Sequence, residues 1–321
     1  MPQPTFRSFL GIAKEATFGT AVPATNFIPV KSMKPKDKQD LLDDAGMRGS
    51  MVDSYGKISG PLMSEFDFDG DVFPDTIGFP LTGVLGDLTS TGSSAPYTHA
   101  LAVLNTGTGQ PPSYTMSDFY TITTRQYAGA KISEVGLKFS GDGLLTYSAK
   151  AVALGSAPTS APTPSYTAVP PLAGWVGAVS IGGSASTFLI DGECTIKRSV
   201  DAIHTVDGTA APYALWSGPV SVSGKLNLVM EDDTQLQNYL NNSQPSLDIN
   251  YTQGAAAALV QVKLHMTKCA FTTAEIDRGK DYIALSVDYE AVANTTDVGG
   301  SGGYSPIKVT LQNALTTGTY K

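Results

Sequence analysis

The sequence has only two cysteines, Cys194 and Cys269, in 321 residues. Two thiols are too few for a disulfide framework, so we expect both to be reduced, with Cys194 buried on the apolar side of a strand. No apolar run reaches the roughly 18 residues of a membrane helix. The first residues also lack the unbroken apolar stretch of a signal peptide. We therefore expect synthesis in a cytoplasm and no membrane contact.

Basic residues are scarce as well. Lys and Arg total 21 against 29 Asp and Glu, which gives a formal net charge of −8. A protein that grips nucleic acid needs a basic surface, so this balance argues against DNA binding. The single basic cluster consists of Lys31, Lys34, Lys36 and Lys38. Four acidic residues lie within or directly after it: Asp37, Asp40, Asp43 and Asp44.

Catalytic signatures are absent. The sequence has no G-x-S-x-G, no Walker A loop, no complete G-x-G-x-x-G and no H-E-x-x-H. Asp67, Asp69 and Asp71 begin like a calcium loop, but Val72 and Gly78 stand where that loop needs glycine and glutamate. Alternating acids and aromatics also fit a strand with one wet face, which we prefer. We expect no enzymatic activity, no metal and no cofactor.

What the sequence does have is a period of two, which is typical of half-buried strands. The longest alternating segment predicts a hairpin over Lys131–Leu154, with a Gly-Asp-Gly turn at Gly141–Gly143. Further strands are predicted around residues 188–197, 220–230, 260–266, 283–289 and 307–311. Two short helices are predicted, at Asp232–Asn241 and Phe73–Leu85, and each must pack on a sheet to be stable.

Three stretches are predicted to be loops. Lys31–Gly60 is polar, has little periodicity and is long for a connection, which indicates a functional arm or disorder. Gly155–Gly174 is a Pro-, Ala- and Thr-rich spacer near the middle of the chain. Gly299–Gly303 is predicted to be a short flexible loop before the last strand.

Five segments, spread over nearly the whole chain, resemble the major tail tube proteins of long-tailed bacteriophages. They are GIAKEATFGTAVPATNFIPV (Gly11–Val30), YTHALAVLNTGTGQPPSYTMSDFY (Tyr97–Tyr120), the central hairpin Ala130–Leu154, Thr195–Leu240 with its short helix, and the closing KVTLQNAL (Lys308–Leu315). Each segment alone is weak, but their order and completeness make the resemblance fairly specific.

The resemblance implies a fold and an assembly. The fold is mainly β: an antiparallel β-sandwich with a short flanking α-helix and long extended loops, which completes a β-barrel between subunits. Residues 1–321 would form one tail tube domain, with the arm at 31–60 and the spacer at 155–174. Hexameric rings would stack along a tape-measure protein, with a tail terminator and baseplate or distal tail proteins at the ends. DNA would pass through without specific binding, in a virion tail made in the host cytoplasm.

The alternation supplies candidates for the lumen wall on the polar side of the predicted strands. They are Glu134, Lys138, Ser140, Thr146, Ser148 and Lys150 of the hairpin, followed by Asp191, Glu193, Asp288 and Glu290. The same hairpin could instead be an outer sheet that faces solvent. Candidates for contacts with neighbouring subunits or rings lie in the arm: Lys34, Lys36, Lys38, Asp43, Asp44, Arg48 and Tyr55.

Two other classes of protein fit part of the sequence. An extracellular β-sandwich adhesin or surface-layer subunit shares the composition but needs an export signal. A carbohydrate-active enzyme on a β-sandwich needs two carboxylates at a defined separation, and no predicted loop or helix presents an obvious pair. We therefore predict a structural tube subunit.

Overall fold

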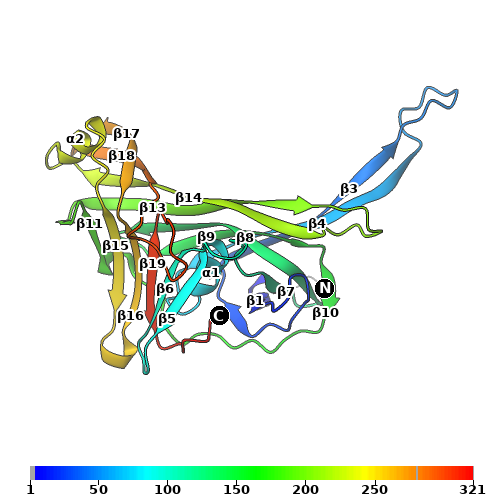
Figure 1. Cartoon of the computed structure of the whole chain (residues 1–321), viewed down its shortest axis with the longest axis horizontal. Helices are drawn as coiled ribbons and strands as arrows, with labels where there is room; N and C mark the ends of the chain where they lie inside the picture. The colour runs from blue at the N-terminus through cyan, green and yellow to red at the C-terminus, as the bar shows by residue number, and fades with distance from the viewer. Residues whose placement is uncertain (1–3, 280, 321) are drawn as a thin grey trace.

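The computed structural model describes residues 4–279 and 281–320 and confirms a mainly antiparallel β fold, with 53% of the chain in strands and 8% in helices. Most long strands belong to one sheet (Figure 1). Eight of them follow each other in the order β3-β4-β9-β8-β13-β14-β18-β17. Their bounds are Ser32–Asp44 (β3), Gly56–Asp71 (β4), Thr146–Leu154 (β9), Thr124–Ser140 (β8), Leu189–Ile203 (β13), Ala214–Val229 (β14), Ala284–Ala291 (β18) and Cys269–Asp277 (β17). We call this set the long sheet.

The first half of β8 also carries a smaller group of strands. In order from β8 these are Tyr114–Phe119 (β7), Phe9–Lys14 (β1) and Asn26–Ile28 (β2), and Ala157–Thr159 (β10) pairs with β8 as well. A second sheet has the order β12-β11-β15-β16-β19-β6-β5. Its strands are Ser184–Ser186, Gly177–Ile181, Leu247–Gln253, Val260–Met266, Lys308–Asn313, Tyr97–Val103 and Gly86–Thr91.

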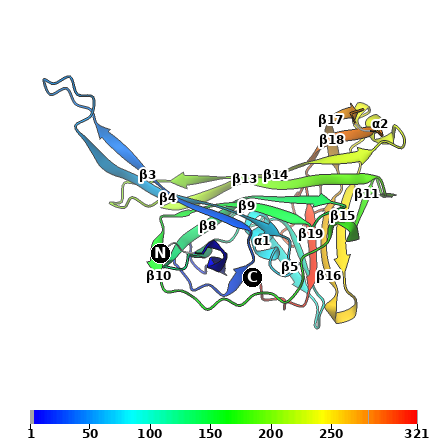
Figure 2. The same ribbon diagram turned by 180° about the vertical axis from the view of Figure 1, so that it is seen from behind.

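The core lies on one side of the long sheet only. Helix α1 (Gly78–Leu85) and strands β1, β5, β6 and β7 all lie on the same side of β13 and β14 (Figures 1 and 2). All eight residues of α1 are buried, and the helix contacts β8, β13, β5 and β6. The inward side chains of the long sheet, such as Phe68, Leu137 and Leu226, belong to the same core cluster. On the opposite face of this sheet, residues 4–279 and 281–320 supply no such cover.

The chain contains two consecutive units with the same topology. The N-terminal unit runs from the hairpin β3–β4 through α1 and the hairpin β5–β6 to the hairpin β8–β9. The C-terminal unit runs from β13–β14 through α2 (Thr234–Leu240) and β15–β16 to β17–β18. In both units the last strand pairs with the second strand: β9 with β4, and β18 with β14. The long sheet is therefore two four-strand units side by side, joined where β8 pairs with β13.

The register shifts show that the two units correspond residue by residue. In the first hairpins, the shift runs from Gln39↔Leu62 to Leu41↔Ser59 in one unit and from Arg198↔Val220 to Val200↔Ser217 in the other. In the last hairpins, it runs from Ile132↔Ala151 to Glu134↔Lys150 and from Phe271↔Tyr289 to Thr273↔Asp288. A β-bulge is a specific local feature, so two at matching places in each unit indicate an internal repeat.

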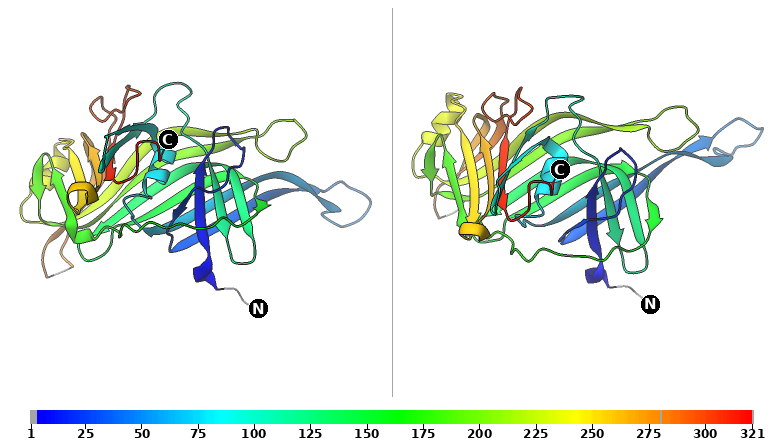
Figure 3. Two further views of the ribbon diagram at one scale, coloured as in Figure 1. Left: turned by 90° about the horizontal axis from the view of Figure 1, so that it is seen from below. Right: turned by 60° about the horizontal axis from the view of Figure 1, so that its bottom comes forward.

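The sequence predicted one segment wrongly. Lys31–Gly60 is mostly strand rather than loop: β3 and the start of β4 form a hairpin whose tip, residues 45–55, projects from the body (Figures 1 and 3). Its strands went unrecognised because the hairpin is exposed on both faces, so no apolar period marks it.

Other segments differ from the prediction in detail. Gly299–Gly303 is a turn held to the second sheet, because the backbone N–H and the hydroxyl of Ser301 each donate a 2.7 Å hydrogen bond to Asp87. The helix predicted from Phe73 begins at Gly78, after a turn at residues 74–77. The helix predicted from Asp232 begins at Thr234, whose N–H donates to Asp232 at 2.9 Å. Within the spacer, only β10 is a strand.

Candidate functional site

The uncovered face of the long sheet brings all ten lumen candidates together. Cross-strand partners point to the same face of a sheet, so the register assigns the face directly. One row across the strands reads Asp71, Thr146, Lys138, Glu193, Lys225 and Asp288; the next reads Asp69, Ser148, Gly136, Thr195, Ser223 and Glu290; a third reads Lys34, Asp67, Lys150, Glu134, Lys197 and Ser221; and Ser140, Asp191 and Asn227 form a shorter one. We call this surface the charged face.

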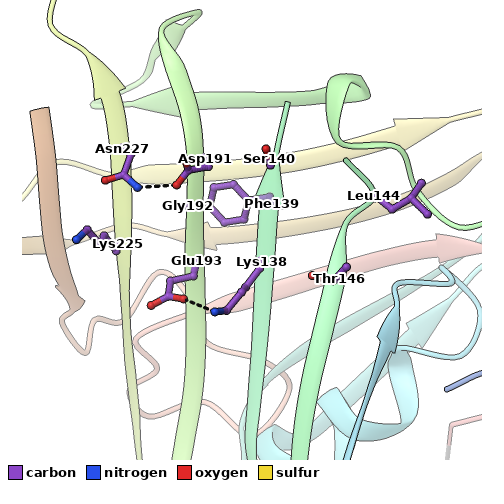
Figure 4. A pocket seen from close by; sticks show the side chains of 10 residues that line it. All are labelled: Lys138, Phe139, Ser140, Leu144, Thr146, Asp191, Gly192, Glu193, Lys225 and Asn227. Atoms are coloured by element: carbon purple, nitrogen blue, oxygen red, sulfur yellow. Dashed lines mark hydrogen bonds and ion pairs between the residues drawn. The ribbon is translucent and has the colours of Figure 1, made fainter. Parts of the chain in front are cut away.

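Charges on this face are arranged as cross-strand pairs. Lys138 Nζ lies 3.3 Å from a Glu193 oxygen, and Lys150 Nζ lies 2.9 Å from Glu134 (Figure 4 shows the first pair). Lys197 lies 3.8 Å from the other oxygen of Glu134. The hydrogen bond to Glu134 raises the pKa of Lys150. Each exposed pair contributes only about 0–1 kcal/mol, so their main effect is to leave few free cations on the surface.

Acidic side chains outnumber basic ones on the charged face. The carboxylates are Asp67, Asp69, Asp71, Glu134, Asp191, Glu193, Asp288 and Glu290, and the ammonium groups are Lys34, Lys138, Lys150, Lys197 and Lys225. Sequence reasoning missed Lys34, Lys197 and Lys225 as members of this face, as well as the three aspartates of β4. Alternation alone assigns a side within each strand, and the missing information is which strands are neighbours.

A shallow hollow of about 440 Å³ lies on this face between β8, β13 and β14 (Figure 4). Its walls include Lys138, Glu193, Asp191 and Asn227. Asn227 Nδ2 donates a 2.5 Å hydrogen bond to Asp191, so the polar groups are satisfied by one another. Its lining is mostly polar and charged, unlike the predominantly apolar lining of a small-molecule site.

The aspartates of β4 lie on a strand with one wet face, as the alternation suggested. Phe66 and Phe68 are buried, whereas Asp67 is exposed and Asp71 pairs with Lys31 at 2.6 Å. Among residues 4–279 and 281–320, no group of three or more His, Cys, Asp or Glu side chains is placed to hold a metal ion. Both cysteines are free and buried, and burial raises the pKa of Cys194 to about 11.

The arm candidates divide between strand and tip. Lys34, Lys36, Lys38, Asp43 and Asp44 lie on β3, and Arg48 and Tyr55 lie in the tip. Lys38 pairs with Glu65, and Asp43 pairs with Lys57 across the hairpin. Arg48 donates to Asp44 and its guanidinium lies 4.7 Å from the centre of the Tyr55 ring.

The arm also exposes apolar side chains, both at its tip and on the adjoining ends of β3 and β4. Met47 and Met51 are fully exposed, and Leu41, Leu42 and Ile58 are more than half exposed. Clustered exposed hydrophobic residues on a projecting element are typical of an interaction surface.

The long sheet ends in two open edges. Strand β3 pairs only with β4, and β17 pairs only with β18, within the described part of the chain. The loop after α2 covers only the start of the β17 edge, where the Cys269 N–H donates a 2.9 Å hydrogen bond to the Pro245 carbonyl, and no closed barrel forms in the single chain. Unpaired edges present free N–H and C=O groups that can pair with another strand. The free backbone N–H and C=O groups of β3 and β17 can therefore form hydrogen bonds with strands of other molecules.

The fold defines an antiparallel β protein with an uncovered, charged sheet face and open edges. A family model described as phage tail tube protein matches residues 5–291, which include both units. The chain belongs to the phage tail tube protein family. Comparison with curated proteins gave no match. The described helices are all too short or too polar to cross a membrane.

Proposed function

We propose that this chain is a structural, non-catalytic subunit of a phage tail tube and that the whole of residues 1–321 acts as one subunit. The four-strand units of several copies would lie side by side and close into a ring. The wall of each ring would contain six such units. The rings would stack on a tape-measure protein between a tail terminator and the baseplate or distal tail proteins. The finished tube would conduct the genome into the host. Family membership supports the tube assignment.

The observation that carries this proposal is the uncovered charged face of the long sheet. An antiparallel sheet often leaves one face in water, but a polar face that spans eight strands and ends in two unpaired edge strands is unusual in a finished protein, because exposed edges are normally protected. Here one side is buried, and the other is polar and continuous from β4 to β18. We infer that the charged face lines the lumen and that its strands continue into neighbouring subunits.

The chemistry of the charged face suits a conduit. Duplex DNA carries one negative charge per roughly 1.7 Å of its axis, so exposed unpaired cations would retard it. Lys138 and Lys150 are each paired with a carboxylate, and acids are in excess. Charges are screened over about 8–10 Å at moderate salt, so only side chains on the lumen wall act on the passing duplex.

The arm is proposed to contact a neighbouring subunit or the adjacent ring. Its tip projects from the body (Figure 3), and Met47 and Met51 in the tip are fully exposed. Ordering a polar hairpin costs conformational entropy, which new contacts in the assembly offset.

Reversal of lumen charges tests the proposal. The variant Asp191→Lys/Glu193→Lys/Glu290→Lys places three unpaired cations on the charged face. Glu231→Lys, at an exposed site before α2, serves as a control for charge reversal outside this face. We expect both variants to form tubes of normal width in negative-stain micrographs. Virions with the triple variant should deliver DNA more slowly, and the delay should shrink as salt is raised.

The same experiment can refute the assignment. Delivery at the control rate by intact tails with all three reversals would show that the charged face does not line the DNA path. Purified protein that stays as discrete small particles under every nucleating condition would contradict the tube itself.

A further inference from the structure

We infer that one ring contains three copies of this chain, each supplying two tube units, and that β17 of one copy pairs with β3 of the next. The inference deepens the proposed function and rests on it for the passage of DNA. It names the partner, a second copy of the chain, and the surface, the two open edges of the long sheet.

The chain already contains one junction between two units. At this junction β8 of the N-terminal unit pairs with β13 of the C-terminal unit, with Ser140 opposite Asp191, Lys138 opposite Glu193 and Glu134 opposite Lys197. Ion pairs cross it at 3.3 Å (Lys138–Glu193) and 3.8 Å (Lys197–Glu134). The junction shows how the outer strand of the last hairpin in one unit, β8, joins the first strand of the next unit, β13.

The same junction can be repeated at the open edges. Strand β17 corresponds to β8, and β3 corresponds to β13, as the matching bulges show. Transferred to these strands, the register sets Lys34 opposite Asp277 and Lys36 opposite Glu275. Lys34 and Lys36 thus each meet a carboxylate on the other edge, whereas Lys38 meets Thr273 and is already paired with Glu65.

These four side chains are free to make the new pairs. All four are exposed, and none forms an ion pair with another described residue. Lysines on an edge strand can also serve only to prevent pairing. That role does not account for acids at the matching positions of the opposite edge.

The helices give independent support. Helix α1 contacts β8 of its own unit and β13 of the next one, and it is wholly buried there. Helix α2 contacts β17 of its own unit, and Leu240 at its end is 62% exposed. The missing neighbour of α2 is the first strand of a following unit, which the β3 edge of another copy would supply.

The register also sets the tilt of a closed barrel. The row that starts at Ser32 of β3 passes through Asp69, Ser148 and Gly136 and reaches Thr195 of β13. The counterpart of Ser32 is Asp191, so each four-strand unit displaces the row by four residues, or one residue per strand. A barrel with equal strand and shear numbers has a strand tilt of about 36°.

That tilt fixes the size of each possible ring. With strands about 4.8 Å apart, barrels of 16 and 24 strands have backbone diameters of about 30 and 45 Å. Inward side chains remove about 5 Å on each side, which leaves bores of about 20 and 35 Å. The two grooves of duplex DNA are about 8.5 and 7.5 Å deep, so the duplex is nearly as wide as the bore of about 20 Å. The 16-strand barrel would therefore leave no room for water around the DNA. Three chains, with 24 strands, form the smallest ring that lets DNA through.

The copy number differs from the six that the resemblance implies, while the wall stays sixfold. Six units surround the bore in both cases. In this chain the units come in covalent pairs joined by residues 155–188, so every second junction of the ring is the internal one between β8 and β13.

Disulfide trapping tests both the edge pairing and the copy number. The full-length double variant Lys36→Cys/Glu275→Cys places thiols on directly opposed residues of neighbouring strands, where Cα atoms lie within disulfide range. The native Cys194 and Cys269 are buried and free. Tubes assembled from the variant, oxidised and denatured without reductant, should give monomer, dimer and trimer bands, with complete oxidation collecting in a trimer.

Controls separate the alternatives. Lys36→Cys alone and Lys36→Cys/Asp288→Cys, in which Asp288 lies one strand inside the edge, should remain monomeric under oxidation. Dimers from Lys36→Cys alone would show that two β3 edges meet, and a ladder that ends at six or has no end would refute three copies. Tubes without any cross-link would refute the edge pairing while the proposed function stands, and absence of tubes with the unmodified chain would refute both.

A charge exchange covers the case in which the cysteine variant does not assemble. Lys36→Glu should abolish tubes, and Lys36→Glu/Glu275→Lys should restore them, with monomers of all variants equally folded by circular dichroism. Assembly by Lys36→Glu alone, or no recovery in the double variant, would contradict the predicted register.

Discussion

The two helices occupy matching places in the two units but differ in what surrounds them. All of α1 is buried, between its own unit and the following one, whereas only Gln235 is buried in α2. The sequence of each helix follows its surroundings: α1 is almost wholly apolar, and α2 is mostly polar with Leu240 left exposed. The difference indicates that the junction between β8 and β13 is complete within the chain. At the β17 edge, the strand that would cover α2 has to come from another molecule.

The largest effect should come from the paired truncations Leu85→Ala and Leu240→Ala. Leu85 is fully buried, so its truncation should lower the free energy of unfolding of the monomer by about 3 kcal/mol. Leu240→Ala should change it by less than about 0.5 kcal/mol, because the side chain is exposed in the single chain. Chemical denaturation of the two monomers measures both values. Equal losses would contradict the contrast between the helices.

A second pair of variants probes the strand that each helix meets. Arg198 on β13 donates 3.0 Å hydrogen bonds to the carbonyls of Val84 at the end of α1 and of Gly218. Burial lowers the pKa of its guanidinium. Arg198→Met leaves both carbonyls without this donor and should cost about 2–3 kcal/mol of unfolding free energy. Its counterpart on β3, Gln39, is exposed, so Gln39→Met should leave the monomer unchanged. A neutral effect of Arg198→Met on thermal unfolding would refute this account of the junction.

The N-terminal unit also carries strands β7, β1 and β2 beside β8, which have no counterpart in the C-terminal unit. Asp118 on β7 allows the environment of these strands to be tested. Burial raises the pKa of Asp118 to about 6, and its Oδ1 has no hydrogen-bond partner among the described residues. The folded state therefore binds the proton more tightly than the unfolded state, and the stability contributed by this group falls as pH rises from about 4 to 6.

The variant Asp118→Asn removes that titration. It should raise the unfolding free energy by about 2 kcal/mol at pH 7.5, with little change at pH 4. Urea unfolding at the two pH values measures the difference. A destabilised variant at pH 7.5 would mean that the ionised carboxylate is favoured in the fold.

The smallest effect on the monomer should come from the arm tip. The corresponding tip of β13–β14 reaches β4, where Ala210 accepts a 2.8 Å hydrogen bond from the N–H of Leu62. The arm tip has no such contact, and Met51 is fully exposed. Met51→Asp should leave monomer stability within about 0.5 kcal/mol and lengthen the lag of tube assembly, as followed by light scattering. Unchanged assembly kinetics would remove the tip from the interfaces.

The fold class and the sides of most strands could be predicted from sequence, because alternation fixes side-chain parity within a strand. Glu134, Lys138 and Glu193 lie on one face for that reason. The neighbours of each strand could not be predicted, since pairing depends on contacts between distant segments. Lys225 therefore escaped notice, although it stands between Glu193 and Asp288.

The internal repeat was hidden for a related reason. The units share their bulges and registers, but few identical residues mark the correspondence; Ser59–Pro61 and Ser217–Pro219 are one example, both reading Ser-Gly-Pro. Backbone pairing is largely independent of side-chain identity, so topology can persist where sequence similarity does not. The β3–β4 hairpin escaped notice because its polar surface carries no apolar period.

A cryo-microscopy cross-section of tubes assembled from the full chain tests the central claim most directly. We predict a bore bounded by 24 strands from three chains, with Lys36 of one copy beside Glu275 of the next and the charged face turned toward the channel. A ring of six chains, or a bore lined by any other surface of the molecule, would contradict it.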